Sequence, residues 1–330
     1  MNHPTHQALL SLLHTLNLAW ARGGPAGQAL QQALAQAAPH GLDWDSDALA
    51  AWLYGHWYQA TPEAPSAPGW GRSLVPLLQA ALQGSARWPR GWAALQALPD
   101  GRWLAGQGTN SRVLAAGEWA NVSRPGVPPA PGDELAVPNR LAWLDEATGF
   151  WAARCTQSEP QGPLSRVYAS ADWPQLPRLL RTLMPLLDDW GLPWSLKCPS
   201  QAAQYGRVDT LVLYVARVHR PGLLALLGPH LPVLQAGLRP LHPPLSCPLA
   251  PGLAWADSPG NGLSFGQHRC LVLARGLRQA WPMADLPPPT PARALPCLRA
   301  SLLQAGIDTD APWLEPAPQP QAASAPDLVN

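Results

Sequence analysis

The feature that most restricts the fold of this chain is its proline content. Proline accounts for 41 of the 330 residues. It fixes the backbone φ angle and removes a hydrogen-bond donor, so helices should be interrupted and loops should be stiff. Hydrophobic residues nevertheless make up 47% of the chain. The sequence therefore predicts short elements around a large core, in two or three domains or one large one.

The charge balance limits the kinds of partner. Only 13% of the residues are charged and the formal net charge is +1, whereas a typical soluble chain is about 25% charged. A nearly neutral chain lacks the broad positive field that attracts nucleic acids or acidic membranes. We therefore expect neither as a partner, although a small basic pocket is compatible with this balance.

The cysteines do not form a recognisable framework. Their number is odd, their spacings are wide, and no CxxC pair occurs among Cys155, Cys198, Cys247, Cys270 and Cys297. This pattern favours buried thiols in a reducing compartment over disulfides or a zinc site, and we expect no metal and no cofactor. The sequence shows neither a secretory signal nor a stretch of about 18 apolar residues, so a bacterial cytoplasmic location is expected.

The pattern of apolar residues predicts an α+β fold in four parts. Residues 1–98 carry helical periodicity, and 99–160 carry short apolar runs split by Gly, Asn and Pro, which is typical of a small β-rich unit. Residues 161–285 are expected to form an α+β core with a mixed sheet and a terminal helix. Residues 286–330 are proline-rich and are expected to be a mobile tail.

Among the helices predicted in the N-terminal part, one spans residues 45–60. Its apolar residues recur at i, i+3, i+4, i+7 and i+8 and include His56. Because His56 shares this apolar face, we interpret it as a core histidine with a satisfied ring rather than as a ligand. The other members of the face are Leu49, Trp52, Leu53 and Trp57.

The core region alternates between strand-like and helix-like segments. Strands are predicted at 164–169, 194–198 and 210–217, and helices at 173–191, 222–238 and 264–281. Gly191 should end the first of these helices, and Pro232 should interrupt the second. The segment 239–262 has no periodicity of its own and is predicted to be a long loop.

The predicted helix 264–281 begins with a possible anion site. Ser264 and Gln267 have the spacing of a capping box, and free N–H groups at a helix start attract anions. Arg269 is expected beside the buried stripe and His268 nearly opposite it. These residues suit a phosphate or carboxylate, but on these residues alone a solvated helix end with a surface His–Arg pair is the simpler explanation.

The chain contains one lysine, Lys197, because the other 21 of its 22 basic residues are arginines. A compositional bias toward the amino acids of GC-rich codons explains this without selection. The alternative is chemical, since lysine can give up its proton when desolvated whereas arginine cannot. A reaction that needs a removable proton would then require lysine at this position.

Polar residues near Lys197 extend the candidate site. Arg207 and Asp209 form either a structural ion pair or a phosphate clamp in which the carboxylate orients the guanidinium, and Tyr205 lies beside them. Arg166 and Tyr168 are two apart on a predicted strand, so they point the same way. The chain has no P-loop, GxSxG, HExxH or dinucleotide fingerprint, which argues against nucleotide hydrolysis, α/β-hydrolase chemistry and zincin proteolysis.

Several stretches resemble the bacterial HopA-type family, first named for a type III secretion effector of plant pathogens. They are RVY, PWSLKCPSQAAQYGRVDTLVLYVAR, APGLAWADSP and above all SFGQHRCLVLARGL. LYGHWYQA and GRWLAGQG…PGDELAVP match the upstream part more loosely. The resemblance spans most of the ordered chain.

The resemblance implies a chemistry. Family members encoded beside lanthipeptide-type clusters are implicated as lyases that remove phosphate from phosphorylated Ser or Thr. By that likeness Lys197 is the expected base, His268 the expected acid, and Arg207, Arg269 and Arg166 the phosphate clamp. Tyr205, Asp209 and Tyr168 would support them. The expected partners are a phosphorylated peptide and a kinase. A non-catalytic module that binds a phosphopeptide or a small phosphate ligand is the alternative.

Overall fold

The computed structural model describes residues 4–36, 46–60, 71–83, 87–156, 159–281 and 286–316. The chain divides into two compact units. Unit 1 comprises Met1–Ala64, Leu241–Leu249 and Leu253–Asn330, and unit 2 comprises Pro65–Pro240 and Ala250–Gly252. The fold class is α+β, as the sequence predicted.

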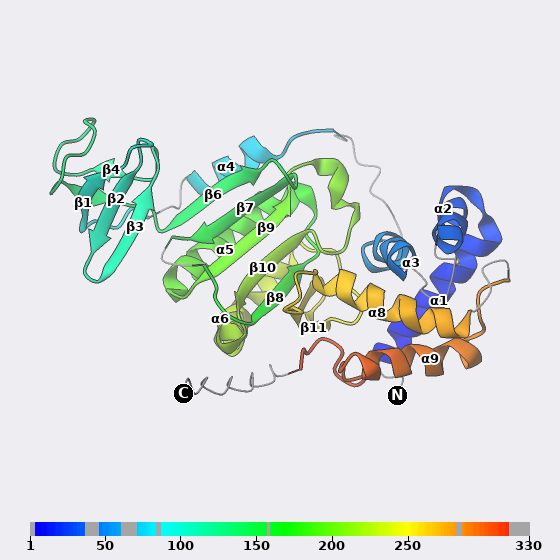
Figure 1. Cartoon of the computed structure of the whole chain (residues 1–330). Coiled ribbons are helices and arrows are strands. Elements are labelled where there is room, and N and C mark those ends of the chain that lie inside the picture. The colour runs from blue at the N-terminus through cyan, green and yellow to red at the C-terminus, as the bar shows by residue number, and fades with distance from the viewer. Residues whose placement is uncertain are drawn as a thin grey trace, which may run out of the picture. The chain divides into compact units, whose positions relative to one another are not determined.

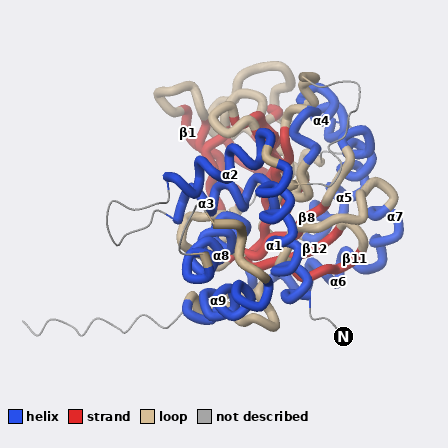
Figure 2. Tube along the Cα trace, turned by 90° about the vertical axis from the view of Figure 1, so that its right-hand side faces the viewer, coloured by secondary structure: helices blue, strands red, loops and turns tan. Residues whose placement is uncertain are grey.

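Unit 1 is mainly helical. Its described elements are α1 (Pro4–Arg22), α2 (Gly24–Gln36), α3 (Ser46–Leu53), the π-helical turn η1 (Tyr54–Tyr58), α8 (Phe265–Ala280), α9 (Pro291–Gln304) and the strands β11 (Cys247–Ala250) and β12 (Leu253–Asp257). Helix α8 packs against α3 and α9, and Figure 2 shows α8 and α9 side by side. The start of α8 confirms the predicted capping box, because Ser264 and Gln267 each bond the other's backbone N–H.

Two predictions for the C-terminal third are wrong. Helix α9 occupies part of the segment 286–330 that was expected to be a tail, and it begins at Pro291, where the missing N–H costs nothing. The expected loop 239–262 contains strands β11 and β12. All five residues of β12 are buried, and such a short apolar run has no periodicity that would reveal it.

The predicted burial of His56 is also wrong. The helix changes from α to π geometry after Leu53, and a π turn places a residue at a different angle around the axis than an α turn does. His56 is consequently exposed, stacked on Trp52 with ring centroids 4.7 Å apart. Its Nδ1 lies 3.0 Å from the Trp52 carbonyl oxygen.

Unit 2 contains a small antiparallel sheet. Its strands are β1 (Trp92–Ala97), β2 (Trp103–Gln107), β3 (Asn110–Leu114), β4 (Ala120–Asn121) and β5 (Glu134–Ala136), in the order β3-β2-β1-β5-β4 (Figure 1). Its core includes Trp92, Ala105 and Leu114. The sheet therefore begins at Trp92, inside the segment 1–98 that was expected to be helical.

The larger sheet of unit 2 carries most of the candidate residues. Its strands are β6 (Arg140–Asp145), β7 (Phe150–Cys155), β8 (Leu164–Ala169), β9 (Trp194–Pro199) and β10 (Leu211–Ala216), ordered β8-β10-β9-β7-β6 within this unit. The segment 140–155 thus belongs to this sheet and not to the small β-rich unit.

The mixed sheet that the sequence predicted is also corrected, since every neighbouring pair among these five strands is antiparallel. Strands β8 and β9 run in the same direction on either side of a helix, but β10 lies between them. Sequence periodicity locates strands without specifying which of them are neighbours, so it could not reveal this insertion.

The helices of unit 2 are α4 (Val75–Gln83), α5 (Leu176–Trp190), α6 (Arg220–Leu227) and α7 (Leu231–Gln235). Helix α5 crosses one face of the larger sheet (Figure 1) and ends at Gly191, whose φ of 71° confirms the predicted stop. The predicted interruption near Pro232 is confirmed by the 3₁₀ turn η5 (Gly228–His230), which separates α6 from α7.

Candidate functional site

Lys197 projects from the face of the larger sheet that α5 does not cover. Strand side chains alternate between faces, and on β9 the neighbours Leu196 and Cys198 are at most 1% exposed. Register places Lys197 between Val212 of β10 and Ala152 of β7. The lysine therefore lies in the middle of the sheet rather than at an edge.

Two aromatic rings link three cations on this face. The Lys197 Nζ lies 4.9 Å from the centroid of the Phe150 ring and 5.7 Å from that of Tyr214. Arg166 stacks on the same Tyr214 ring at 5.2 Å, and Arg207 lies 5.7 Å from Phe150. Aromatic faces attract cations, so this arrangement holds positive charges close together that would otherwise repel one another.

Arg207 forms the ion pair that the sequence left open. Its Nε and NH2 groups donate to the two carboxylate oxygens of Asp209, at 2.5 and 2.9 Å. The Asp209 side chain is only 7% exposed, while that of Arg207 is 22% exposed. The bidentate edge of this guanidinium is thus occupied by the chain's own carboxylate, which fixes its orientation.

The two candidate tyrosines are buried. Tyr205 is 1% exposed, its hydroxyl donates to the Pro199 carbonyl oxygen at 3.0 Å, and burial raises its pKa well above the ordinary value. Tyr168 is 2% exposed and is paired with Val212, on the Lys197 face as its two-residue spacing from Arg166 predicted. Both side chains are therefore packed inside the protein, where they support the sheet and are not accessible to a ligand from solvent.

Arg269 is completely buried, so the expectation that it lies off the apolar stripe of its helix is wrong. Its Nε donates to the Pro312 carbonyl oxygen at 2.9 Å and its NH2 to that of Leu314 at 3.1 Å. Its NH1 pairs with Glu315 at 2.7 Å. The guanidinium therefore attaches the segment after α9 to α8, and five donors in a planar fork make arginine suited to this task.

His268 is held by the same group of residues. Its Nδ1 lies 2.9 Å from NH1 of Arg269 and 3.7 Å from Oε1 of Glu315. Nδ1 therefore lies between a guanidinium donor and a carboxylate acceptor, and the protonation of the ring decides which of the two it bonds. Burial alone would raise the pKa of Glu315, but His268 and Arg269 outweigh it and lower that pKa.

The candidate residues are divided between the two units. Lys197, Arg166, Arg207, Asp209, Tyr205 and Tyr168 belong to unit 2, whereas His268 and Arg269 belong to unit 1. The structure brings the first three together around shared rings, and it brings His268 together with Arg269. The pairing of Lys197 with His268 stays a prediction.

Sequence reasoning missed Phe150 and Tyr214, the rings that organise the cations. One signal was available, since the chain has 17 tryptophans but only two phenylalanines. Both phenylalanines face candidate cations, Phe150 below Lys197 and Phe265 below Arg269, whose Cζ lies 4.6 Å from the ring centroid.

The chemistry of the Lys197 face suits an anion. Guanidinium and ammonium groups bind phosphate and carboxylate oxygens. Within the described ranges, no three His, Cys, Asp or Glu side chains gather in a way that could hold a metal ion. The five cysteines are free, and burial raises the pKa of Cys198, the neighbour of Lys197, to about 12. None of the described helices is both long and apolar enough to cross a bilayer.

Comparisons with known proteins identify relatives. Residues 146–314 match the model of the HopA1 effector protein family. An effector protein structure from Pseudomonas syringae pv. tomato strain DC3000 is 22% identical, with a TM-score of 0.40, and the match covers 51% of this chain and 63% of that one. One from P. syringae pv. syringae strain 61 is 16% identical, with a TM-score of 0.44, over 88% and 98% of the two chains. The comparison with curated proteins gave no match.

Proposed function

This chain belongs to the HopA1 effector protein family, and on that premise we propose that it is a phospho-Ser/Thr lyase in the maturation of a ribosomally made, lanthipeptide-like peptide. The observation that supports this proposal is the Lys197 face. The only lysine of the chain shares one aromatic ring with Arg166 and another with Arg207. Such a set of cations suits a phosphorylated side chain.

The proposed reaction is a β-elimination. The base removes the Cα proton of the phosphorylated residue, and the electrons of that C–H bond form a Cα=Cβ double bond. The Cβ–O bond breaks with its electron pair on the departing phosphate, which takes a proton. The products are a dehydroamino acid and inorganic phosphate, and no redox partner is consumed.

The proposed roles follow from what each side chain can do. Lys197 takes the Cα proton, and Arg166 with Arg207 neutralises the phosphate charge that grows as the Cβ–O bond breaks. His268, in its imidazolium form, gives a proton to the leaving oxygen. Arg269 orients His268 and bonds the chain's own carbonyl groups, so its role is to position the histidine rather than to contact phosphate.

The test is the charge-conserving change Lys197→Arg. The parent protein and the variant are incubated with a synthetic phosphothreonine peptide, and mass spectrometry follows loss of phosphoric acid. Removal of a general base should slow elimination by about 100-fold or more, while peptide affinity measured by fluorescence polarisation stays within a few-fold. Arg178→Lys on the exposed side of α5 is the control and should eliminate at the parental rate.

A phosphopeptide-binding module without turnover is the second candidate. The bidentate pair between Arg207 and Asp209 favours it, because a guanidinium already fixed by a carboxylate suits static recognition. In that case the parent protein binds the phosphothreonine peptide and releases no phosphate, and Lys197→Arg binds equally well. Under either function the phosphorylated peptide requires a kinase, which we propose as a partner.

A further inference from the structure

Strand β6 forms the end of the larger sheet within unit 2 and borders a cavity of about 660 Å³. Four consecutive residues of the strand line this cavity: Arg140, Leu141, Ala142 and Trp143. Consecutive strand side chains point to opposite faces, so a cavity that touches all four lies along the edge of the strand. A terminal edge carries backbone N–H and C=O groups that no strand pairs.

Among the described residues, backbone pairing along this side of the chain reaches the start of the edge. The N–H of Val137 donates to the Pro89 carbonyl oxygen at 3.1 Å, and that of Asn139 donates to Arg87 at 2.9 Å. Beyond this point Ala142, Trp143 and Leu144 are all exposed. Three exposed residues in succession show that both faces of this end of β6 are accessible, as well as its edge.

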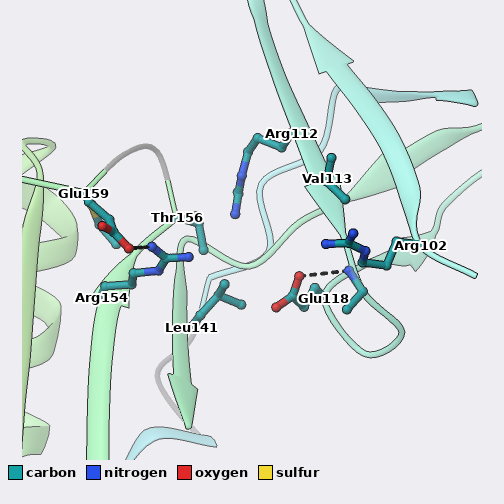
Figure 3. Close-up of a pocket in the computed structure, with 10 residues that line it drawn as sticks. Arg102, Arg112, Val113, Glu118, Leu141, Arg154, Thr156 and Glu159 are labelled. Atoms are coloured by element: carbon teal, nitrogen blue, oxygen red, sulfur yellow. Dashed lines mark hydrogen bonds and ion pairs between the residues drawn. The ribbon is translucent and has the colours of Figure 1, made fainter. Parts of the chain in front are cut away.

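A second cavity of about 360 Å³ adjoins the first and shares Glu118, Leu141 and Arg154 with it. It lies between the small sheet and the larger one, and Figure 3 shows Arg112 and Arg154 extending into this space. Arg102 also lines it. The two cavities together give the β6 edge one apolar section, with Trp88 and Trp143, and one section rich in arginine.

Among the described arginines that line this second cavity, Arg112 is the one without a salt bridge to a carboxylate. Arg102 pairs with Asp100, and Arg154 pairs with Glu159. Arg112 stacks on the Trp92 ring, 5.5 Å from its centroid, and forms no salt bridge with any carboxylate of the described residues. Burial lowers its pKa, which Glu118 only partly offsets. This half-buried charge would gain from an acidic ligand.

We propose that the open edge of β6 binds an extended acidic peptide segment as an added strand, with Arg112 contacting an acidic side chain of that peptide. Backbone pairing supplies the affinity in this mode of recognition, and pockets beside the edge supply the specificity. Trp88 and Trp143, which are 43% and 41% exposed, offer apolar surface to alternate residues of the peptide. This proposal is independent of the lyase activity.

Three fluorescein-labelled peptides test it by fluorescence polarisation with the full chain. One alternates Val with Glu, the second replaces each Glu by Lys, and the third keeps the Glu residues but replaces alternate Val residues by Pro. The Val–Glu peptide should bind. The Lys peptide loses the contact with Arg112, and the Pro peptide loses the backbone donors, so both should bind at least about tenfold more weakly.

Arg112→Gln should weaken binding of the Val–Glu peptide about tenfold, since a charged hydrogen bond is lost. Arg293→Gln, an exposed position in α9, is the control and should bind as the parent does. Amide hydrogen exchange supplies a second readout, because an added strand should slow exchange in residues 140–145. Equal binding of the three peptides, or unchanged exchange in β6, would overturn the proposal. So would failure of all three to bind, with sedimentation showing that this edge joins two copies of the chain.

Discussion

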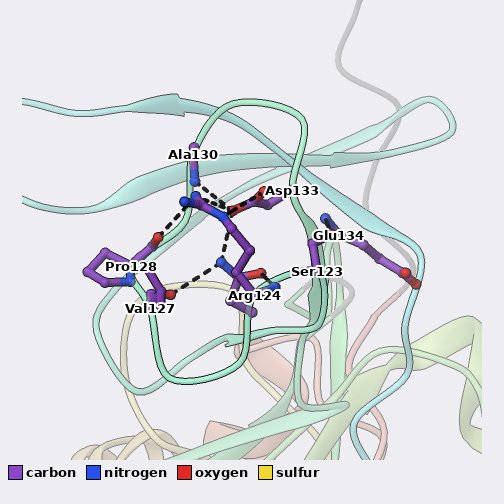
Figure 4. Close-up of polar contacts among 8 residues, drawn as sticks. Ser123, Arg124, Val127, Pro128, Ala130, Asp133 and Glu134 are labelled. Carbon is purple, nitrogen blue, oxygen red and sulfur yellow. Dashed lines mark hydrogen bonds and ion pairs between the residues drawn. The ribbon is translucent and has the colours of Figure 1, made fainter.

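Asp133 shows how much of a loop one carboxylate can organise. It pairs with Arg124 across the β4–β5 connection, and it also accepts from the Asn121 side chain and the Ala130 N–H, each at 2.8 Å (Figure 4). The hydrogen bonds from Arg124 contribute most, and together these donors lower the pKa of Asp133 to about 2. The folded state therefore prefers the ionised carboxylate more strongly than the unfolded chain does.

The direction of this pKa shift determines how the stability of the fold depends on pH. A depressed folded pKa contributes stability above the ordinary pKa of about 4, and this contribution is lost as pH falls toward 2. We expect Asp133→Asn to lower Tm at neutral pH and to flatten the fall of Tm between about pH 4 and pH 2, measured by circular dichroism. Glu146→Gln, exposed in the β6–β7 turn, should keep the parental slope. An unchanged slope in Asp133→Asn would contradict the assignment.

At the scale of elements, the sequence predicts features that depend on neighbouring residues but not contacts between residues far apart in the chain. The capping box of Ser264, the stop at Gly191 and the shared direction of Arg166 and Tyr168 depend on neighbours within a few residues, and all are confirmed. The burial of Arg269 depends on Pro312, 43 positions further along the chain. No periodicity encodes that contact, and for the same reason the ring of Phe150 below Lys197 was missed.

Gly266 lets α8 approach the turn η1. A Cβ at this position would lie 2.6 Å from two atoms of the Tyr58 ring, and Tyr58 is 1% exposed, so its ring has little room to move. Gly266→Ala should gain up to about 1 kcal/mol of helix propensity but lose more through overpacking, which costs about 1–3 kcal/mol. Urea denaturation should therefore show a lower free energy of unfolding.

Gly222 in α6 provides the matched control. Its added Cβ would meet only the Trp190 ring, at 3.8 Å, which is an ordinary contact. Gly222→Ala should therefore raise the free energy of unfolding by up to about 1 kcal/mol. If both variants changed stability in the same direction, the close approach at Gly266 would not be the cause.

At the scale of the whole molecule, each unit has its own buried interior. Unit 1 buries Leu9, Leu273 and Leu298 from three different helices, and unit 2 buries Trp151 and Trp194 from the larger sheet. Unit 2 also encloses an ion pair between Arg140 of β6 and Asp188 of α5, both 2% exposed. Separate cores are the physical basis for separate cooperative unfolding.

We therefore predict two calorimetric transitions, each sensitive to changes in one unit only. Gly266→Ala should lower the transition of unit 1 and leave the other in place. Asp188→Ala leaves the buried Arg140 charge without its partner, which should lower the free energy of unfolding by about 3–5 kcal/mol. It should lower only the transition of unit 2. If the stability changes of the two single variants add up in the double variant, the two units are independent, because substitutions at uncoupled sites have additive effects. A single transition that both substitutions shift would show instead that the two cores unfold as one.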